Sequence, residues 1–132
     1  MVNADITEKE KFVSKWVKSH IEDGEKILNK PVLFTEFGLS NKANGFDHAH
    51  RLLFYKSIFD TIYESAKRNG AGSGAFIWQL IVEGMEIFHD SFAFVPESIP
   101  SLHSLLKEQS CRLATLRYGS DLVKQIFKNV CK

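Results

Sequence analysis

The sequence has 132 residues, a length typical of one modest domain, and a formal net charge of +1 at pH 7. This balanced charge gives no electrostatic reason to expect binding to nucleic acid or to an acidic membrane surface. No apolar run approaches the roughly 20 residues of a membrane-spanning helix, and no basic segment followed by an apolar stretch opens the sequence, so neither a membrane span nor a signal peptide is predicted.

The first predicted element is a helix that ends before Pro31. Thr7 and Glu10 have the spacing of a capping box, in which an N-cap hydroxyl is followed three residues later by a carboxylate. Apolar residues then recur at helical spacing and predict one buried face: Phe12, Val13, Trp16, Val17, Ile21, Ile27 and Leu28. Pro31 ends this helix because proline interrupts helical hydrogen bonding.

The segment 30–38, Lys-Pro-Val-Leu-Phe-Thr-Glu-Phe-Gly, predicts a buried strand with a carboxylate at its end. Burying an ionised Glu costs several kcal/mol unless its surroundings pair and solvate it. Glu36 is therefore either a buried, hydrogen-bonded strand-end acid or a residue placed there for chemistry. Catalytic side chains of parallel-strand barrels lie at the C-terminal ends of the strands, so Glu36 is a candidate catalytic carboxylate.

A second helix and a second strand follow. The helix has one apolar face, made of Leu52, Tyr55, Phe59, Ile62 and Ala66. Basic residues and a glycine at 67–70 predict its end. The segment 74–80 is almost continuously apolar and predicts a second strand. A strand, a helix and a strand in this order predict a βαβ unit with parallel strands.

The C-terminal part of the sequence predicts a long ordered loop over 83–100 and then two helices. The third helix runs from Pro100 or Ser101 to a break at Tyr118-Gly119, and a short final helix begins at Ser120. Cys111 and Cys131 are too few for a disulfide scaffold. One bridge between them and two unpaired thiols are both open, and two unpaired thiols are the favoured interpretation.

Two predicted strands make a sheet with two open edges, and open edges invite pairing, so self-association through them is one expectation. A complete eight-stranded α/β barrel needs about 250 residues. The pattern is that of the end of such a barrel without its beginning.

Three motifs extend this interpretation: 30–38, Tyr63-Glu-Ser-Ala-Lys-Arg68, and Phe76-Ile-Trp-Gln-Leu80 followed by Val82-Glu-Gly-Met85. With them, the stretch from Phe12 to about Leu113 resembles the C-terminal part of plant endo-β-1,4-mannanases of glycoside hydrolase family 5. The resemblance implies an α/β fold, a partial (β/α)8 TIM barrel containing about strands seven and eight. It divides the chain into a truncated catalytic portion, 1–118, and a divergent helical tail, 119–132, in which no similarity to the family is found.

The resemblance implies a secreted enzyme that hydrolyses mannan, glucomannan and galactomannan of the cell wall with retention at the anomeric carbon. In such a double displacement one carboxylate attacks, while a second, about 5 Å away, protonates the leaving oxygen and later activates water. By resemblance Glu36 is the nucleophile. Trp78 is the aromatic floor that holds the sugar being cleaved, since apolar faces of a pyranose pack well on an indole. Mannan-type polysaccharide is then the partner, and no cofactor is expected.

Two departures from the family pattern limit the expected activity. The acid/base Glu, which the family carries in an Asn-Glu pair on its fourth strand, has no counterpart here. The sequence therefore predicts a chain that is inactive alone, because loss of one of the two carboxylates removes orders of magnitude in rate. Leu39 stands where family members usually have a basic residue. A non-catalytic carbohydrate-binding or interaction remnant, a truncated product without a stable fold, and a related β-glucanase are the alternatives.

Other polar residues are weaker candidates for a site. The residues Asp47, His48, His50, His89 and Asp90 can be drawn as metal ligands, but no pair has the spacing of a zinc or di-metal site, so no metal is predicted. Glu83 follows the second strand, within a segment that matches the family. A loop-ordering or substrate-facing role for Glu83 is therefore a further, less favoured, hypothesis.

Overall fold

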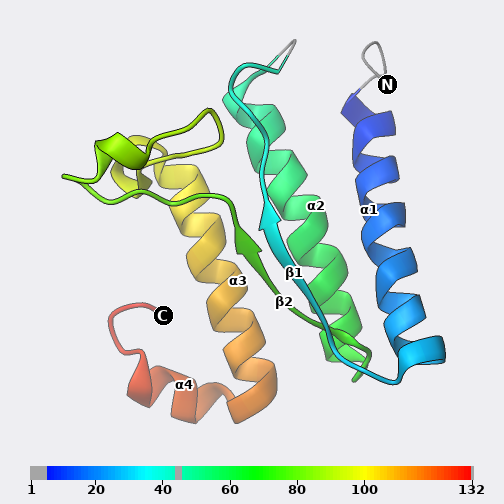
Figure 1. Cartoon of the computed structure of the whole chain (residues 1–132). Coiled ribbons are helices and arrows are strands. Elements are labelled where there is room, and N and C mark those ends of the chain that lie inside the picture. Colours follow the sequence, from blue (N-terminus) through cyan, green and yellow to red (C-terminus); the bar gives the residue numbers. More distant parts are fainter. Residues whose placement is uncertain (1–5, 44–45, 132) are drawn as a thin grey trace.

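The computed structural model describes residues 6–43 and 46–131; residues 1–5, on which the expectation of no signal peptide depends, lie outside the described residues. The chain order is helix, strand, helix, strand and two helices (Figure 1). The elements are α1 (Ile6–Asp23), continued by a π-helical segment (Gly24–Leu28), β1 (Val32–Phe37), α2 (His48–Lys67), β2 (Gly72–Ile77), two 3-10 turns (Glu86–Phe88 and Pro96–Ser98), α3 (Pro100–Tyr118) and α4 (Ser120–Ile126). None of the described helices is long and apolar enough to span a membrane.

The strands β1 and β2 pair in parallel, which confirms the predicted βαβ unit. Val32 pairs with Gly72 and Phe37 with Ile77, and the register shifts between Phe34 and Phe37. The predicted bounds of the second strand, 74–80, are wrong at both ends. The chain leaves the ladder after Ile77, where the Trp78–Gln79 peptide is cis, and Leu80 instead forms an isolated bridge with Phe94.

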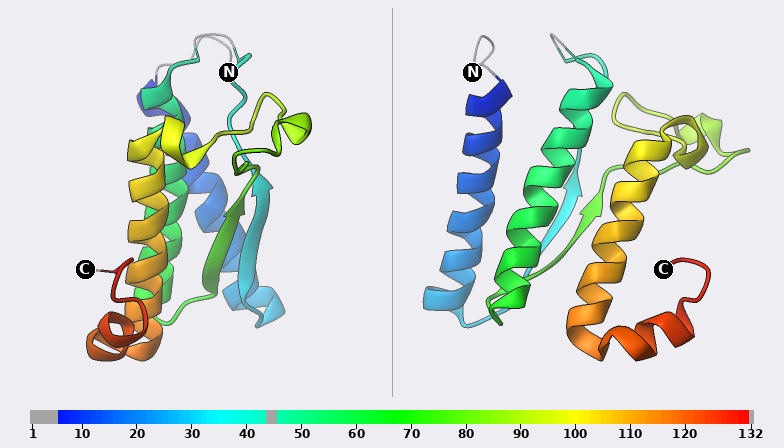
Figure 2. Two further views of the ribbon diagram at one scale, coloured as in Figure 1. Left: turned by 90° about the vertical axis from the view of Figure 1, so that its left-hand side faces the viewer. Right: turned by 180° about the vertical axis from the view of Figure 1, so that it is seen from behind.

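All three long helices lie on one side of the sheet (Figure 2). Two clusters of buried side chains fill the space between them. The first contains Val17, Ile21, Phe34, Ile58 and Ile62, and the second contains Tyr55, Phe59, Phe94, Leu102 and Leu105. Because Phe37 and Ala75 pack against both clusters, the helix-facing side of the sheet joins them into a continuous core.

The opposite side of the sheet is open in the described part of the chain. Leu33 is 50% exposed and Phe76 is 62% exposed. The described residues form a sheet of only two strands, so each strand keeps one unpaired edge, as predicted. The structure therefore has the predicted α/β character, but the prediction of a buried strand is wrong for β1: only Phe34 is buried, because helices cover one face of the sheet and the described residues leave the other face open.

The helix α1 differs from its prediction in two respects. Thr7 lies inside the helix, which already includes Ile6, so the prediction of Thr7 as N-cap is wrong. Only part of the predicted apolar face is buried: Val17 and Ile21 are in the core, whereas Phe12, Trp16, Ile27 and Leu28 are exposed. The exposed members lie where the described residues supply no further layer to cover them.

The C-terminal helices contradict the prediction of two unpaired thiols. Cys111 in α3 and Cys131, 20 residues later, form a disulfide. Gly119 ends α3 with a φ of +81°, a conformation that favours glycine, and α4 begins in a new direction. The chain after α4 then returns to α3 (Figure 1), which brings the two sulfurs together, a consequence of the turn that residue spacing alone does not reveal.

Candidate active site

Glu36 lies near the end of β1 and is exposed. The alternative that Glu36 is a buried, hydrogen-bonded acid is therefore wrong. Its φ is +57°, in the left-handed region that residues other than glycine seldom adopt. This conformation occurs where the β1–β2 register is irregular, between Phe34 and Phe37. Backbone strain of this kind costs about 1–3 kcal/mol and clusters at functional sites. Within the described residues, the Glu36 carboxylate accepts no hydrogen bond and makes no ion pair, so it is free to meet a ligand.

Trp78 directly follows β2, and its side chain is 42% exposed. Its backbone N–H donates to the carbonyl oxygen of Phe37, at an N···O distance of 2.8 Å. Because Phe37 follows Glu36, this bond brings the two predicted site residues to the same edge of the sheet. The parallel pairing of β1 and β2 thus places a carboxylate and a half-exposed indole at neighbouring strand ends.

The indole of Trp78 is held by Asp90, a residue that the sequence analysis considered only as a metal ligand. The Trp78 Nε1–H donates to Asp90 Oδ2 at 2.8 Å. The other carboxylate oxygen, Oδ1, accepts the backbone N–H groups of Phe92 and Ala93, each at 2.9 Å. The hydrogen bond from the indole is the largest influence on the pKa of Asp90. Together with the two backbone N–H groups it lowers that pKa below its usual value, against the opposing effect of partial burial.

Two hydrogen bonds tie together the loops that follow the strands, and a third lies within the loop after β2. Ser40 Oγ donates to Ser91 Oγ at 2.9 Å, and the backbone N–H of Asn41 donates to the carbonyl oxygen of Ser91 at 2.7 Å. The side-chain amide of Gln79 donates to the carbonyl oxygen of Phe88 at 3.0 Å. The loop after β1, which follows Glu36, and the loop after β2, which contains Asp90, therefore support one another.

Arg51 in α2 holds the loop after Glu36 through a hydrogen bond to its backbone. Its side chain is 2% exposed, and its Nη2 donates to the carbonyl oxygen of Leu39 at 2.9 Å. The guanidinium also lies over the Phe46 ring, 4.7 Å from the centroid. No signal in the sequence identified Arg51, because an arginine on a helix is more often a solvated charge than a buried donor.

The weaker candidates do not gather into a site. Asp47 caps α2 by accepting the backbone N–H of Ala49 at 2.9 Å. Glu86 orders its loop by accepting the backbone N–H of Gly84 at 2.9 Å, whereas Glu83 is exposed beside it. His48 and His50 lie in the first turn of α2, and His89 lies in the loop after β2, next to Asp90. Among the residues that the structure describes, no cluster of His, Cys, Asp and Glu could hold a metal ion.

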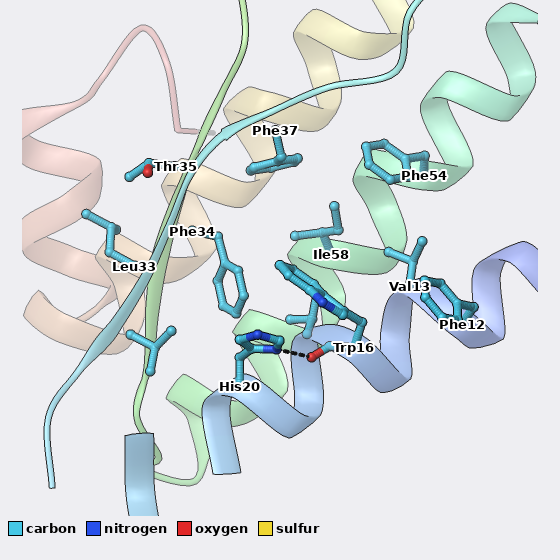
Figure 3. A pocket seen from close by; sticks show the side chains of 12 residues that line it. Phe12, Val13, Trp16, His20, Leu33, Phe34, Thr35, Phe37, Phe54 and Ile58 are labelled. Atoms are coloured by element: carbon cyan, nitrogen blue, oxygen red, sulfur yellow. Dashed lines mark hydrogen bonds between the residues drawn. The ribbon is translucent and has the colours of Figure 1, made fainter. Parts of the chain in front are cut away.

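An apolar groove of about 520 Å³ lies between α1 and β1 (Figure 3). Phe12, Trp16 and Leu33 are among the side chains that line it, and neither Glu36 nor Trp78 does. The ring of His20 also lines the groove, and its Nδ1 lies 2.8 Å from the carbonyl oxygen of Trp16. Thr35 and Phe37 also line the groove, so it follows β1 as far as the two residues that flank Glu36.

No family model matches the chain. The similar proteins described below are all plant mannan endo-1,4-beta-mannosidases. The chain is 50% identical to mannan endo-1,4-beta-mannosidase 2 of Oryza sativa subsp. japonica over 129 residues, which are 98% of this chain and 29% of that protein. It is 50% identical to mannan endo-1,4-beta-mannosidase 5 of Arabidopsis thaliana over 98% of this chain and 30% of that protein. It is 56% identical to mannan endo-1,4-beta-mannosidase 2 of Arabidopsis thaliana over 83% of this chain and 25% of that protein.

The extent of these matches matters in two ways. The chain spans less than a third of the length of these relatives. The first two matches cover 129 of 132 residues, so the similarity continues past Tyr118, and the prediction of a tail without similarity to the family is wrong.

Proposed function

We propose, from the premise that this chain is a homologue of the plant mannan endo-1,4-beta-mannosidases over part of their length, that it carries the nucleophile half of a retaining β-mannosidase site. One observation supports this most strongly. Glu36 is exposed and strained at the end of β1, and Trp78 follows the adjacent parallel strand. Mannan, glucomannan and galactomannan are the proposed substrates of the whole site.

In this proposal β1 and β2 are strands seven and eight of a (β/α)8 barrel. The helices α1, α2 and α3 cover one face of the sheet, as the outer helices of such a barrel do. The uncovered face carries the exposed Leu33 and Phe76, and it corresponds to the barrel interior, which is filled by apolar side chains. The unpaired edges correspond to the positions of neighbouring strands.

Each of the two site residues has one chemical task. In the complete site, the Glu36 carboxylate attacks the anomeric carbon of a β-mannosyl unit and forms a covalent glycosyl ester, while the second carboxylic acid protonates the glycosidic oxygen as it leaves. Trp78 offers its indole face to the sugar ring, so that the anomeric carbon is held near the attacking oxygen. Because Glu36 and Trp78 come from adjacent strand ends, the nucleophile and the sugar platform are fixed relative to each other.

Turnover needs a second carboxylate as acid and base, and the 132 residues contain no Asn-Glu pair to supply it. We therefore expect this chain to bind mannan oligosaccharides and to release no reducing sugar from them. Binding without cleavage is also what the alternative of a non-catalytic carbohydrate-binding remnant implies.

The test compares two tryptophan variants of the purified chain. Galactomannan in a native gel should retard the wild-type chain, and Trp78→Ala should remove the retardation. Trp16→Ala is the matched control, since Trp16 is similarly exposed, at 48%, but lies on α1 beside the apolar groove. Retention of binding in Trp78→Ala would contradict the sugar platform. Reducing-sugar release that disappears in Glu36→Ala would contradict the expected inactivity.

A further inference from the structure

The carboxylate of Asp90 joins the Trp78 side chain to the backbone of the loop after β2. Its Oδ2 accepts the indole N–H at 2.8 Å, and its Oδ1 accepts two backbone N–H groups, from Phe92 and Ala93. Each oxygen thus has a separate task. Asp90 is itself partly buried, and the two backbone bonds fix its carboxylate in place.

A half-exposed indole needs such a support if it is to act as a platform. Trp78 lies one residue beyond the last paired residue of β2, and the bond from its backbone N–H to Phe37 does not fix the orientation of its side chain. A sugar ring packs on an indole only when the ring plane has the right orientation, and each freely rotating side-chain bond reduces the population of that orientation. A hydrogen bond to the indole N–H removes this freedom, because the N–H lies at one edge of the ring.

We propose that Asp90 is a positioning residue, which holds the Trp78 indole in the plane that receives the sugar ring beside Glu36. This inference rests on the proposed function of Trp78 as the sugar platform. The same loop is also fastened to the loop after Glu36, since Ser91, adjacent to Asp90, contacts both Ser40 and Asn41. Asp90 therefore fixes the indole relative to the strand end that carries the nucleophile.

Because Oδ2 accepts the indole N–H and Oδ1 accepts the backbone N–H groups, one substitution can remove the first contact and keep the others. In Asp90→Asn the remaining side-chain oxygen continues to accept the backbone N–H groups of Phe92 and Ala93, as asparagine does in many turns. The new NH2 group faces the indole N–H, and two donors cannot form a hydrogen bond. Glu86→Gln is the matched control: Glu86 belongs to the same loop and accepts a backbone N–H, from Gly84, without facing the indole.

Two measurements test the inference on the full chain. The first is the indole N–H signal of Trp78 in a 15N-tryptophan-labelled sample, with the Trp16 signal as internal reference. We expect Asp90→Asn to move the Trp78 signal upfield, and Glu86→Gln to leave it in place. The second is affinity for mannohexaose by calorimetry. We expect Asp90→Asn to weaken it about fivefold, corresponding to the loss of one hydrogen bond.

A double-mutant cycle distinguishes positioning from general loosening of the loop. Trp78→Phe keeps an aromatic ring and removes the N–H, so adding Asp90→Asn to Trp78→Phe should cause no further loss of affinity. A further fivefold loss in that background, or an unshifted indole signal in Asp90→Asn, overturns the inference. Wild-type affinity in Asp90→Asn also overturns it while leaving the proposed function intact. Failure of the wild-type chain to bind mannohexaose contradicts both.

Discussion

Gly38 lies so close to Trp78 that a Cβ built on Gly38 would be 2.2 Å from the Trp78 carbonyl oxygen. The backbone hydrogen bond from Trp78 to Phe37 is made at the same place. A glycine is therefore required by the approach of two backbones, one leading from Glu36 and the other entering the loop after β2. The spacing between the proposed nucleophile and the proposed sugar platform depends on this contact.

Gly38→Ala should destabilise the chain by about 1–3 kcal/mol, because the obstructing atom belongs to the backbone and cannot rotate away. Urea unfolding measures the change. Gly74→Ala in β2 is the control: its Cβ would meet the Leu33 side chain at 3.1 Å, and a side chain yields more easily. Equal stability of wild type and Gly38→Ala would show that the two backbones separate without a penalty.

Glu36→Asn should stabilise the chain by about 0.5–1 kcal/mol, because asparagine adopts the left-handed conformation with less strain than glutamate. Thermal unfolding provides the comparison. Thr35→Asn, on the same strand without a positive φ, should bring no such gain. A less stable Glu36→Asn variant would mean that the backbone at this position is not strained by its side chain.

Arg51→Ala should cost about 1.5–3 kcal/mol, since it removes a buried charged donor from the carbonyl oxygen of Leu39. Lys56→Ala in the same helix should change the free energy of unfolding by less than about 1 kcal/mol, because its ion pair with Asp60 is exposed to solvent. Chemical denaturation of both variants tests the contrast. Similar losses in both would remove Arg51 as the support of the loop after Glu36.

The Asp90 contact predicts an acid transition in the fluorescence of Trp78, observed in a Trp16→Phe background. Because the pKa of Asp90 is lowered in the folded chain, the contact is fully present above the usual value, about pH 4. It is lost as the pH falls below that through the lowered value. Asp90→Asn should abolish the transition. An identical acid transition in Asp90→Asn would assign it to other carboxylates.

Reduction of the Cys111–Cys131 disulfide should loosen α4 and leave β1 and β2 protected. A disulfide that closes a loop of 20 residues lowers the entropy of the unfolded chain, and by the loop-entropy relation this stabilises the folded state by about 3 kcal/mol. Hydrogen exchange with and without reductant locates the change, since α4 packs on α3 and lies away from the sheet (Figure 1). Cys111→Ser should reproduce it. Faster exchange in β1 would show that the tail supports the site.

The helices were predictable because apolar spacing is a local pattern, and the strand pairing was predictable because a strand, helix, strand order follows a general rule of topology. The apolar spacing of Tyr55, Phe59 and Ile62 identifies the core face of α2, and all three are buried. Glu36 and Trp78 reach one edge of the sheet because parallel strands joined by a helix end on the same side, a rule that needs no side-chain detail.

The remaining features depend on contacts between distant segments. The bond between Trp78 and Asp90 joins a strand end to a turn, and nothing in either local pattern identifies the pair. The disulfide depends on the direction in which the chain leaves Gly119. Phe12 and Trp16 have the spacing of buried residues, yet they are exposed, because hydrophobic periodicity does not say which layer covers a side chain.

The parallel pairing of β1 with β2 also makes the sheet a long-range contact. Val32 and Gly72 are separated in the sequence by the whole of α2, so no short hairpin can begin the sheet. Helix formation takes about a microsecond or less, whereas non-local strand contacts wait for closure of the intervening chain. In refolding, helical ellipticity should therefore appear first, and the strand ends that carry Glu36 and Trp78 should meet only in the final, slower step.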